Sequence, residues 1–505
     1  MRGRLALALA TGLGLLAAAC GSTVPLAQQK QIQETGAQEP GDTFADTGLV
    51  GSVANPTVAG RRTGLTGLRT ATAAPGTAMP GRAASAGVNG PGVTSTTVKI
   101  GIGYVSDAGA LNAALGAAGA TQIDTRRAYN ALVKDINDRG GIGGRKVSIV
   151  YHEYSAGSTE PYDQQDQAAC ARWTQDDPVF ISDGGLQSDT LLACMEKAGA
   201  ISALYMDPIH GQPKRQFRRF PHYLQPANID LDDLQHLRID SLVKMGCFRD
   251  TPKIGLVSID DPDFRNMVDT ALVPALRKHG LKLADQVYVR PGESGSDIGP
   301  TVTAISNAAV RFNSSGVTHV LFTDAGANLA FFFMQSAENQ GYRPRYCLDA
   351  NSGNTGLAGL LQDTGSEEQL RGAMSIGWVP SLDVLPEDLP EWVKPPREEE
   401  CYRVMRRAGV TMDSANARGQ AQIVCDTMWL IEATLNRAGP VLNQRTFLQG
   451  LQRLGEGYRP AGIGFGVSLT ATRRDGLRTV ANMRFFEECT CFRYVSGQYP
   501  VYNTD

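Results

Sequence analysis

The densest group of chemically active side chains in the sequence is an acidic cluster. Asp260, Asp261 and Asp263 follow an apolar stretch that predicts a strand. Neighbouring carboxylates can serve general acid–base catalysis or bind Ca²⁺. A calcium loop also needs a glycine turn and a later glutamate, which this cluster lacks. We therefore interpret it as a helix N-cap and the rim of a pocket.

Other enzyme motifs are missing from the sequence. It contains neither a GxxxxGK phosphate loop nor a GxSxG nucleophile elbow. The glycines of residues 140–144 follow a predicted helix and precede a predicted strand, the reverse of a dinucleotide fingerprint, so they predict a turn. The 6 histidines occur singly and no CxxC pair is present. We expect no catalytic residue, no metal site and no cofactor.

The first twenty residues indicate export from the cytoplasm. Arg2 and Arg4 precede a short apolar stretch, and small residues then lead to Cys20. This is the layout of a secretory signal peptide, residues 1–20, rather than a transmembrane helix. A cysteine at the cleavage site resembles a bacterial lipobox, although Ala17 stands where leucine is usual. We expect Cys20 to be lipidated and to anchor the chain to the membrane; the alternative is plain secretion with Cys20 incidental.

Composition fits an exported globular body on a stalk. The formal net charge of −3 gives no sign of a basic surface, so nucleic acid is not an expected partner. Residues 21–95 are rich in Gly, Ala, Thr and Pro and show no hydrophobic periodicity. Such a segment cannot bury enough apolar surface to offset its chain entropy, which predicts a disordered stalk.

From residue 97 onward, strand patterns alternate with helix patterns. Residues 121–139 carry apolar side chains at helical spacing, between predicted strands at residues 98–104 and 146–151. This rhythm predicts an α/β fold with parallel sheets covered on both faces, and the length predicts two doubly wound lobes. Pro274 predicts a kink in the helix expected over residues 262–279. The region after residue 462 predicts short antiparallel strands.

The order of several motifs resembles the type I periplasmic binding proteins of the leucine/isoleucine/valine-binding group. The similarity spans residues 97 to about 502. Its motifs are TVKIGIG at 97–103, DINDRGGIGGR at 135–145, FISDGGLQS at 180–188, VSIDDPDF at 257–264, the helix ending in Ala-Gly at 421–439, and CTCFRY at 489–494, a variant seen in actinobacterial members.

The resemblance implies a division of the chain into two lobes joined by three hinge crossings. Residues 97–227 plus 380–458 would form lobe one, and residues 228–379 plus 459–505 would form lobe two. The solute would lie in the cleft between them, at the carboxyl ends of the strands.

The resemblance also implies ligand-binding residues. The loop following the strand at residues 179–182 and a second segment after the next strand would supply the first lobe's contacts. Phe264 would face them from lobe two, and Trp378 would close over the ligand or lie buried at a hinge. Asp349 falls one position from the acidic residue that anchors an amino acid's ammonium group, which puts a plain aliphatic amino acid in doubt. The expected contacts are Gly185, Leu186, Gln187, Ser188, Tyr205, Met206, Phe264, Asp349 and Trp378.

Disulfides are expected because the exported body contains eight cysteines besides Cys20, an even number. The resemblance implies that Cys170 pairs with Cys194 and that Cys401 pairs with Cys425. Cys247, Cys347, Cys489 and Cys491 would then pair among themselves, in an order the sequence leaves open.

The resemblance finally implies a function. The chain would be an extracytoplasmic, lipid-anchored solute-binding protein that is not an enzyme. As a monomer, it would deliver a small polar solute, such as an amino acid or amide, to an ABC permease by cleft closure. The alternative is a ligand sensor that acts on a partner receptor without transport.

Overall fold

A five-stranded parallel sheet opens the folded body in the computed structural model, which describes residues 87–107, 123–184, 188–203, 211–323, 328–501. Its strand order is β2-β1-β3-β4-β5. The strands are β1 (Thr97–Val105), β2 (Lys146–Tyr154), β3 (Ile181–Asp183), β4 (Ile201–Ala203) and β5 (Tyr223–Leu224). Thr97 pairs with Lys146 at the start of β1 and Val105 with Tyr154 at its end.

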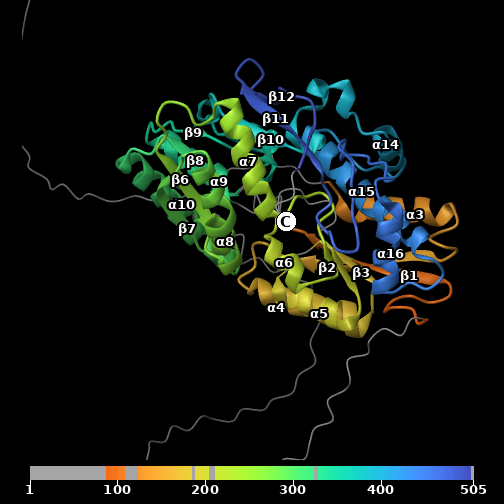
Figure 1. Ribbon diagram of the computed structural model, residues 1–505. Helices are drawn as coiled ribbons and strands as arrows, with labels where there is room; N and C mark the ends of the chain where they lie inside the picture. Colours follow the sequence, from red (N-terminus) through yellow and green to blue (C-terminus); the bar gives the residue numbers. More distant parts are fainter. Residues whose placement is uncertain (1–86, 108–122, 185–187, 204–210, 324–327, 502–505) are drawn as a thin grey trace, which may run out of the picture. The chain divides into compact units, whose positions relative to one another are not determined.

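Alternation along β1 explains how helices cover both faces of this sheet (Figure 1). Ile100 and Ile102 pack in the core with Tyr129 and Leu132 of α3 (Thr125–Asp138). Gly101 points the other way, where a Cβ atom would lie 2.9 Å from the Trp173 indole. On that second face lie α4 (Tyr162–Ala171), a π-helical turn (Arg172–Asp176) and α5 (Asp189–Ala198).

Later helices complete the first face. Arg139, at the C-terminal end of α3, donates to Glu432 of α15 with a 2.7 Å hydrogen bond. The helices of this layer are α14 (Glu398–Arg407), α15 (Ala415–Ala438) and α16 (Gln444–Leu454). The chain therefore returns to its first sheet after building a second one.

The second sheet is four-stranded and parallel, in the order β7-β6-β8-β9. Its strands are β6 (Ile254–Ile259), β7 (Leu283–Val289), β8 (His319–Thr323) and β9 (Arg345–Tyr346). Leu256 and Leu321 pack with α7 (Leu231–Met245), α8 (Pro262–Met267) and α9 (Val273–Lys278). Val257 and Val320 face the other side, where α10 (Ile298–Ser315), α11 (Asn328–Asn339) and α12 (Asn354–Asp363) lie.

A small antiparallel sheet lies beside β9. Its strands are β10 (Met374–Gly377), β11 (Thr479–Phe486), β12 (Cys491–Tyr494) and β13 (Tyr499–Pro500). β11 pairs with all three others. This confirms the expected antiparallel strands near the end of the chain. The remaining helices are α6 (Lys214–Arg219), α13 (Pro380–Asp383) and short 3-10 turns at Gly295–Asp297, Ala350–Ser352, Glu367–Leu370, Pro386–Asp388 and Glu391–Val393.

The helix expected over residues 262–279 is interrupted, as Pro274 predicted. A π-helical turn, Val268–Leu272, separates α8 from α9, and Pro274 lies in the first turn of α9. Proline lacks an N–H group and its ring crowds the preceding turn, so the regular hydrogen-bond ladder is broken there.

The folded body begins earlier than the sequence indicated. Gly90 donates to the carbonyl oxygen of Leu442 at 2.7 Å, and Asn443 donates to the carbonyl oxygen of Val88 at 3.0 Å. Residues 88–90 are therefore bonded to the residues that begin α16, and Gly92 accepts from the Lys99 amide at 2.9 Å, so the expectation that the stalk reaches residue 95 was wrong. The rest of the expected stalk, and Cys20, lie outside the described residues.

Four disulfide bonds link the eight cysteines. The two expected pairs, Cys170–Cys194 and Cys401–Cys425, are both present, with Cα–Cα distances of 6.1 and 5.9 Å. The other four cysteines form Cys247–Cys347 and Cys489–Cys491, which settles the order that the sequence left open.

Candidate functional site

Segments that follow the carboxyl ends of strands in the two parallel sheets contact each other. After β2, the amide of Tyr162 donates to the carbonyl oxygen of Glu293, which follows β7, at 2.7 Å. The amide of Gly295 donates back to Ser158 at 2.7 Å. The approach is tight, because a Cβ atom on Gly295 would lie 2.5 Å from the main chain of Gly157. These contacts bring the carboxyl edge of the first sheet against the carboxyl edge of the second.

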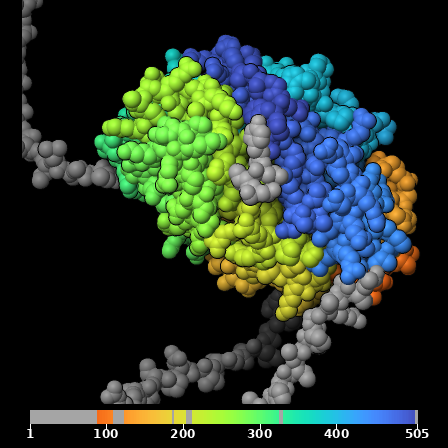
Figure 2. Space-filling model, viewed as in Figure 1, coloured from red at the N-terminus to blue at the C-terminus, as the bar shows by residue number. Residues whose placement is uncertain are grey.

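A second contact between the same two edges is ionic. Asp263, at the start of α8, lies 3.2 Å from Arg215 and 3.3 Å from Arg219 of α6. Asp263 is 8% exposed, while both arginine side chains are about half exposed. Figure 2 shows the surface of α8, in green, adjoining that of α4 to α6, in yellow. Asp263 of the acidic cluster therefore ties the two sheets together.

The first sheet's edge carries a carboxylate held by its neighbours. Asp107, just after β1, accepts hydrogen bonds from the Ser155 hydroxyl at 2.6 Å and from the Ala156 and Gly157 amides at 2.8 and 2.9 Å. Burial alone would raise the pKa of Asp107, but these donors outweigh it and lower the pKa. Asp107 thus stays charged and orients the loop after β2.

Two further carboxylates lie beneath this edge. Asp183 ends β3 and accepts from the Tyr129 hydroxyl at 3.1 Å. Asp166 of α4 accepts from the Ser188 amide at 2.7 Å and from the Tyr154 hydroxyl at 2.9 Å. Burial raises the pKa of Asp166, and the Ser188 and Tyr154 donors offset only part of that rise. Asp166 therefore fixes the start of α5, directly after the expected ligand loop.

Ser188 is the described member of that loop. It is the N-cap residue of α5, and both its amide and its hydroxyl lie beside the Asp166 carboxylate and help to lower the pKa of that group. Gly185, Leu186, Gln187, Tyr205 and Met206 lie outside the described residues.

The second sheet's edge contains a buried ion pair. Arg238 of α7 donates to Asp349 at 2.7 Å and to the carbonyl oxygen of Phe322, near the end of β8, at 2.7 Å. The other oxygen of Asp349 accepts from the Asn351 amide at 2.9 Å. Arg238 is 1% exposed and Asp349 is 4% exposed. Because Asp349 uses both oxygens within the protein, the geometry does not favour it as an ammonium ligand.

The two expected aromatic contacts are packed in the core. Phe264 is 6% exposed and Trp378 is fully buried. Trp378 follows β10, and its indole N–H has no partner among the described residues. For Trp378 this fits the hinge interpretation. Phe264 belongs to the same buried core cluster as Met267 and Val268, so its place in the structure indicates a packing role.

A late segment of the chain is bonded to the first expected crossing, between residues 227 and 228. The amide of Gly476 donates to the carbonyl oxygens of Gln225 and Asn228, each at 3.1 Å. Asp426 of α15 accepts from the amides of Ala461 and Gly462, each at 2.7 Å. Residues 461 and 462 are thus attached to a helix that packs on the first sheet.

Sequence reasoning missed α6 and Arg238. The segment KRQFRR places four cations within six residues, which could have marked a charged contact surface. Arg238 gives no such signal, since its partner Asp349 is 111 residues away.

Metal-binding geometry is sparse in the part of the chain that the structure describes. One group, Asp388 with Cys489 and Cys491, brings potential ligand atoms within 4.8 Å of each other. The two cysteines are joined in a disulfide and so offer no thiolate. Among the described residues, no helix is both long and apolar enough to cross a bilayer.

Comparison with solved structures identifies similar folds. A solute-binding protein from R. palustris in complex with 4-hydroxybenzoate is 12% identical, with a TM-score of 0.57 over 80% of this chain and 97% of its own. A branched-chain amino acid transporter protein from Thermus thermophilus with bound valine is 14% identical, with a TM-score of 0.55 and coverages of 80% and 96%.

A third similar structure is a fatty acid ABC transporter substrate-binding protein from Thermomonospora curvata. It is 15% identical, with a TM-score of 0.55 over 82% of this chain and 94% of its own. Among curated proteins, none matches the sequence. The sequence profile described as "Periplasmic binding protein" matches residues 100–487. The chain therefore belongs to the periplasmic binding protein family, whose members bind solutes for ABC transporters and are not enzymes.

Proposed function

We propose that this chain is a lipid-anchored, extracytoplasmic protein that binds a small polar solute between its two parallel sheets and delivers it to an ABC permease. The observation that carries the proposal is the meeting of the two sheets at their carboxyl edges, through Asp263 with Arg215 and through Gly295 with Ser158. Open α/β sheets bind ligands at such edges.

In this proposal the two lobes have different roles. The lobe built on the first sheet would supply the start of α5, which begins after Ser188. The lobe built on the second sheet would close over the solute. A solute that binds the closed form more tightly shifts the equilibrium toward it by that difference in affinity.

A carboxylate-bearing solute, such as an amino acid or a related acid, fits the proposal. The N-terminus of α5 presents amide groups and a positive helix-dipole end beside Ser188. The similar structures from R. palustris and Thermus thermophilus hold 4-hydroxybenzoate and valine. Pairing of Asp349 with Arg238 argues for an ammonium group bound elsewhere or for a solute without one.

A ligand screen tests the solute class. Amino acids, their amides, hydroxybenzoates and fatty acids would be added to the full chain, and melting temperature would be recorded. A ligand present at 100 times its Kd stabilises the folded state by about 2.7 kcal/mol. We expect a carboxylate to raise the melting temperature and its methyl ester to fail. Stabilisation by the ester as well would contradict the carboxylate assignment.

Uptake separates transport from sensing. Cells lacking this chain should lose uptake of the labelled solute and regain it with the wild-type chain. Cys20→Ser should release the chain from membrane fractions. Normal uptake without the chain would favour the ligand sensor, and an unchanged membrane fraction for Cys20→Ser would refute the lipid anchor.

A further inference from the structure

A groove remains at the end of the molecule where α7 finishes, and solute binding does not account for it. It has a volume of about 570 Å³ and lies between the C-terminal end of α7 and the hairpin of β11 and β12. The lining residues are Lys244, Met245, Asn482, Arg484, Phe485, Phe486 and Val495. α7 has 15 residues, so the groove lies about 22 Å along this helix from its start near the expected hinge.

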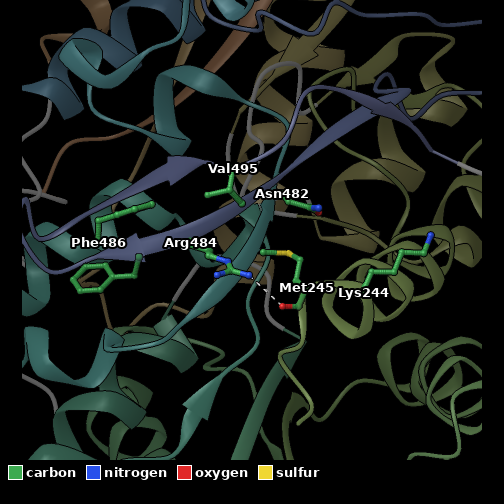
Figure 3. A pocket seen from close by; sticks show the side chains of 7 residues that line it. Lys244, Met245, Asn482, Arg484, Phe486 and Val495 are labelled. Atoms are coloured by element: carbon green, nitrogen blue, oxygen red, sulfur yellow. Dashed lines mark hydrogen bonds between the residues drawn. The ribbon is translucent and has the colours of Figure 1, made fainter.

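The charge in the groove is positive and lacks acidic partners within the described residues. Lys244 and Arg484 are exposed, and neither forms a salt bridge there. Arg484 donates to the carbonyl oxygen of Met245 at 3.3 Å, as Figure 3 shows. It stands directly across the ladder from Arg493. Arg493 is paired with Asp388 and Glu488, so Arg484 is the member of this like-charged pair without a carboxylate.

Apolar side chains surround these cations. Val495 is 44% exposed, one of few large apolar side chains so open in the described structure. Phe486 is half-buried, with the Arg493 guanidinium 5.3 Å from its ring centroid. Phe485, also half-buried, packs against Phe492. Figure 3 shows Arg484 lying between Phe486 and Met245, with Val495 and Asn482 on the strands above. An occupant therefore needs an anionic group and an adjoining apolar group.

Charge and shape decide between the possible occupants. A second copy of this chain in a symmetric contact would place Lys244 and Arg484 against the same two cations of its partner, and this like-charge contact is unfavourable. A membrane surface is held by clusters of about four to eight basic residues, and the groove offers two in a concave setting. An aspartate or glutamate beside an aliphatic side chain matches both the unpaired cations and the apolar floor.

We propose that this groove is a docking site for an acidic, partly apolar segment of a partner protein. Lys244 and Arg484 bind its carboxylate, and Val495 with Phe486 bind its apolar side chain. The proposal goes beyond solute binding, because the groove lies outside the cleft between the two parallel sheets.

Site-specific photo-crosslinking in cells that make the full chain provides the test. A photoreactive amino acid replaces Val495, and the matched control places it at Val310, which is 50% exposed on α10. Arg484→Glu and Lys244→Glu are combined with the probe at Val495. Arg484→Lys retains the charge, and Lys282→Glu reverses an exposed charge on another surface. Melting curves establish that each variant folds.

We expect Val495 to crosslink to one discrete protein and Val310 not to do so. Arg484→Glu and Lys244→Glu should each lower the yield by about tenfold, because reversing a charge at a close interfacial pair costs more than 1.4 kcal/mol. Arg484→Lys and Lys282→Glu should not. The crosslinked partner segment should contain an aspartate or glutamate, and changing that acid to lysine should restore the yield with Arg484→Glu.

Several results would overturn the proposal. One is equal crosslinking from Val495 and Val310. Another is a yield that Arg484→Glu leaves unchanged in a folded variant. A crosslink to lipid, with flotation on phosphatidylglycerol vesicles but not on phosphatidylcholine vesicles, would assign the groove to a membrane surface. A crosslinked dimer of the chain would assign it to self-association.

Discussion

Arg215 Nη1 lies 3.2 Å from Asp263 Oδ1, and this pair joins a helix of the first parallel sheet to a helix of the second. Arg219 contacts the other oxygen of the same carboxylate. A single acidic side chain thus receives two cations across the boundary where the solute is proposed to bind. The pair forms when the two edges are together, so it should favour the closed arrangement.

Loss of this contact should open the molecule. We expect Asp263→Asn to shift the closed–open equilibrium by about 1 kcal/mol, roughly fivefold, since the arginines are half exposed and partly screened. Small-angle scattering should show a larger radius of gyration for Asp263→Asn. Asp260→Asn is the matched control, because Asp260 pairs with Arg265 within its own segment. An equal radius of gyration for Asp263→Asn and wild type would contradict the proposal that Asp263 favours the closed arrangement.

The Arg238–Asp349 pair should be important for stability. Both side chains are buried, so removing one partner leaves an uncompensated charge in the interior. We expect Arg238→Met or Asp349→Leu, each made alone, to lower the free energy of unfolding by about 3–5 kcal/mol. The double change Arg238→Met with Asp349→Leu should recover much of that loss. Urea unfolding measures all of these variants, and additive losses in the double variant would contradict the pairing.

Acidic conditions should stabilise the fold through Asp383. Burial raises the pKa of Asp383 to about 7, and the donors Tyr494, Val379 and Asn354 offset only part of that rise. The folded state therefore holds a proton that the unfolded state has lost between about pH 4 and 7. The contribution of Asp383 to the free energy of unfolding is therefore greatest below pH 4. It falls by on the order of 4 kcal/mol as the pH rises to 7.

Denaturant unfolding at several pH values tests that sign. Asp383→Asn should flatten the fall in unfolding free energy between pH 4 and 7, whereas Asp363→Asn, at an exposed position, should leave the slope unchanged. Asp426, whose pKa burial raises to about 6, contributes a second and similar slope. A fall as steep in Asp383→Asn as in wild type would contradict the assignment.

The four disulfides should differ in what they contribute. Cys247 and Cys347 are 100 residues apart, and Cys489 and Cys491 are 2 apart. Constraining the unfolded chain should stabilise the fold by about 4.7 kcal/mol for the first and under about 2 kcal/mol for the second. Denaturant unfolding of the two double serine variants compares them. Thiol labelling of the denatured, unreduced chain should find no thiol among these eight cysteines.

The local spacing of apolar residues predicted several helices and strands, but it failed where polar residues are buried. The helix at residues 125–138 and the break near Pro274 follow from apolar spacing and from proline chemistry. α7 was missed because it is buried on most sides: Asp233, Gln235 and Arg238 lie in the interior beside its leucines, so no clean apolar face remains.

The candidate site was harder to predict than the fold. The resemblance singled out the loop before α5, and Ser188 does lie at the N-terminus of that helix. The ion pairs of Arg215, Arg219 and Arg238 join residues that are far apart in the sequence. Side chains that pair over such distances leave no local periodicity, so only the folded arrangement reveals them.

The most direct test of a solute held between the two sheets is native mass spectrometry of the full chain, purified gently from the envelope of its own cells. We expect one small molecule bound per chain, released when the chain unfolds. Gln187→Ala should lower its occupancy by up to about tenfold at equal stability, through loss of a hydrogen bond worth about 0.5–1.5 kcal/mol. A wild-type mass equal to that of the chain alone, or an adduct held equally by Gln187→Ala, would contradict the proposed site.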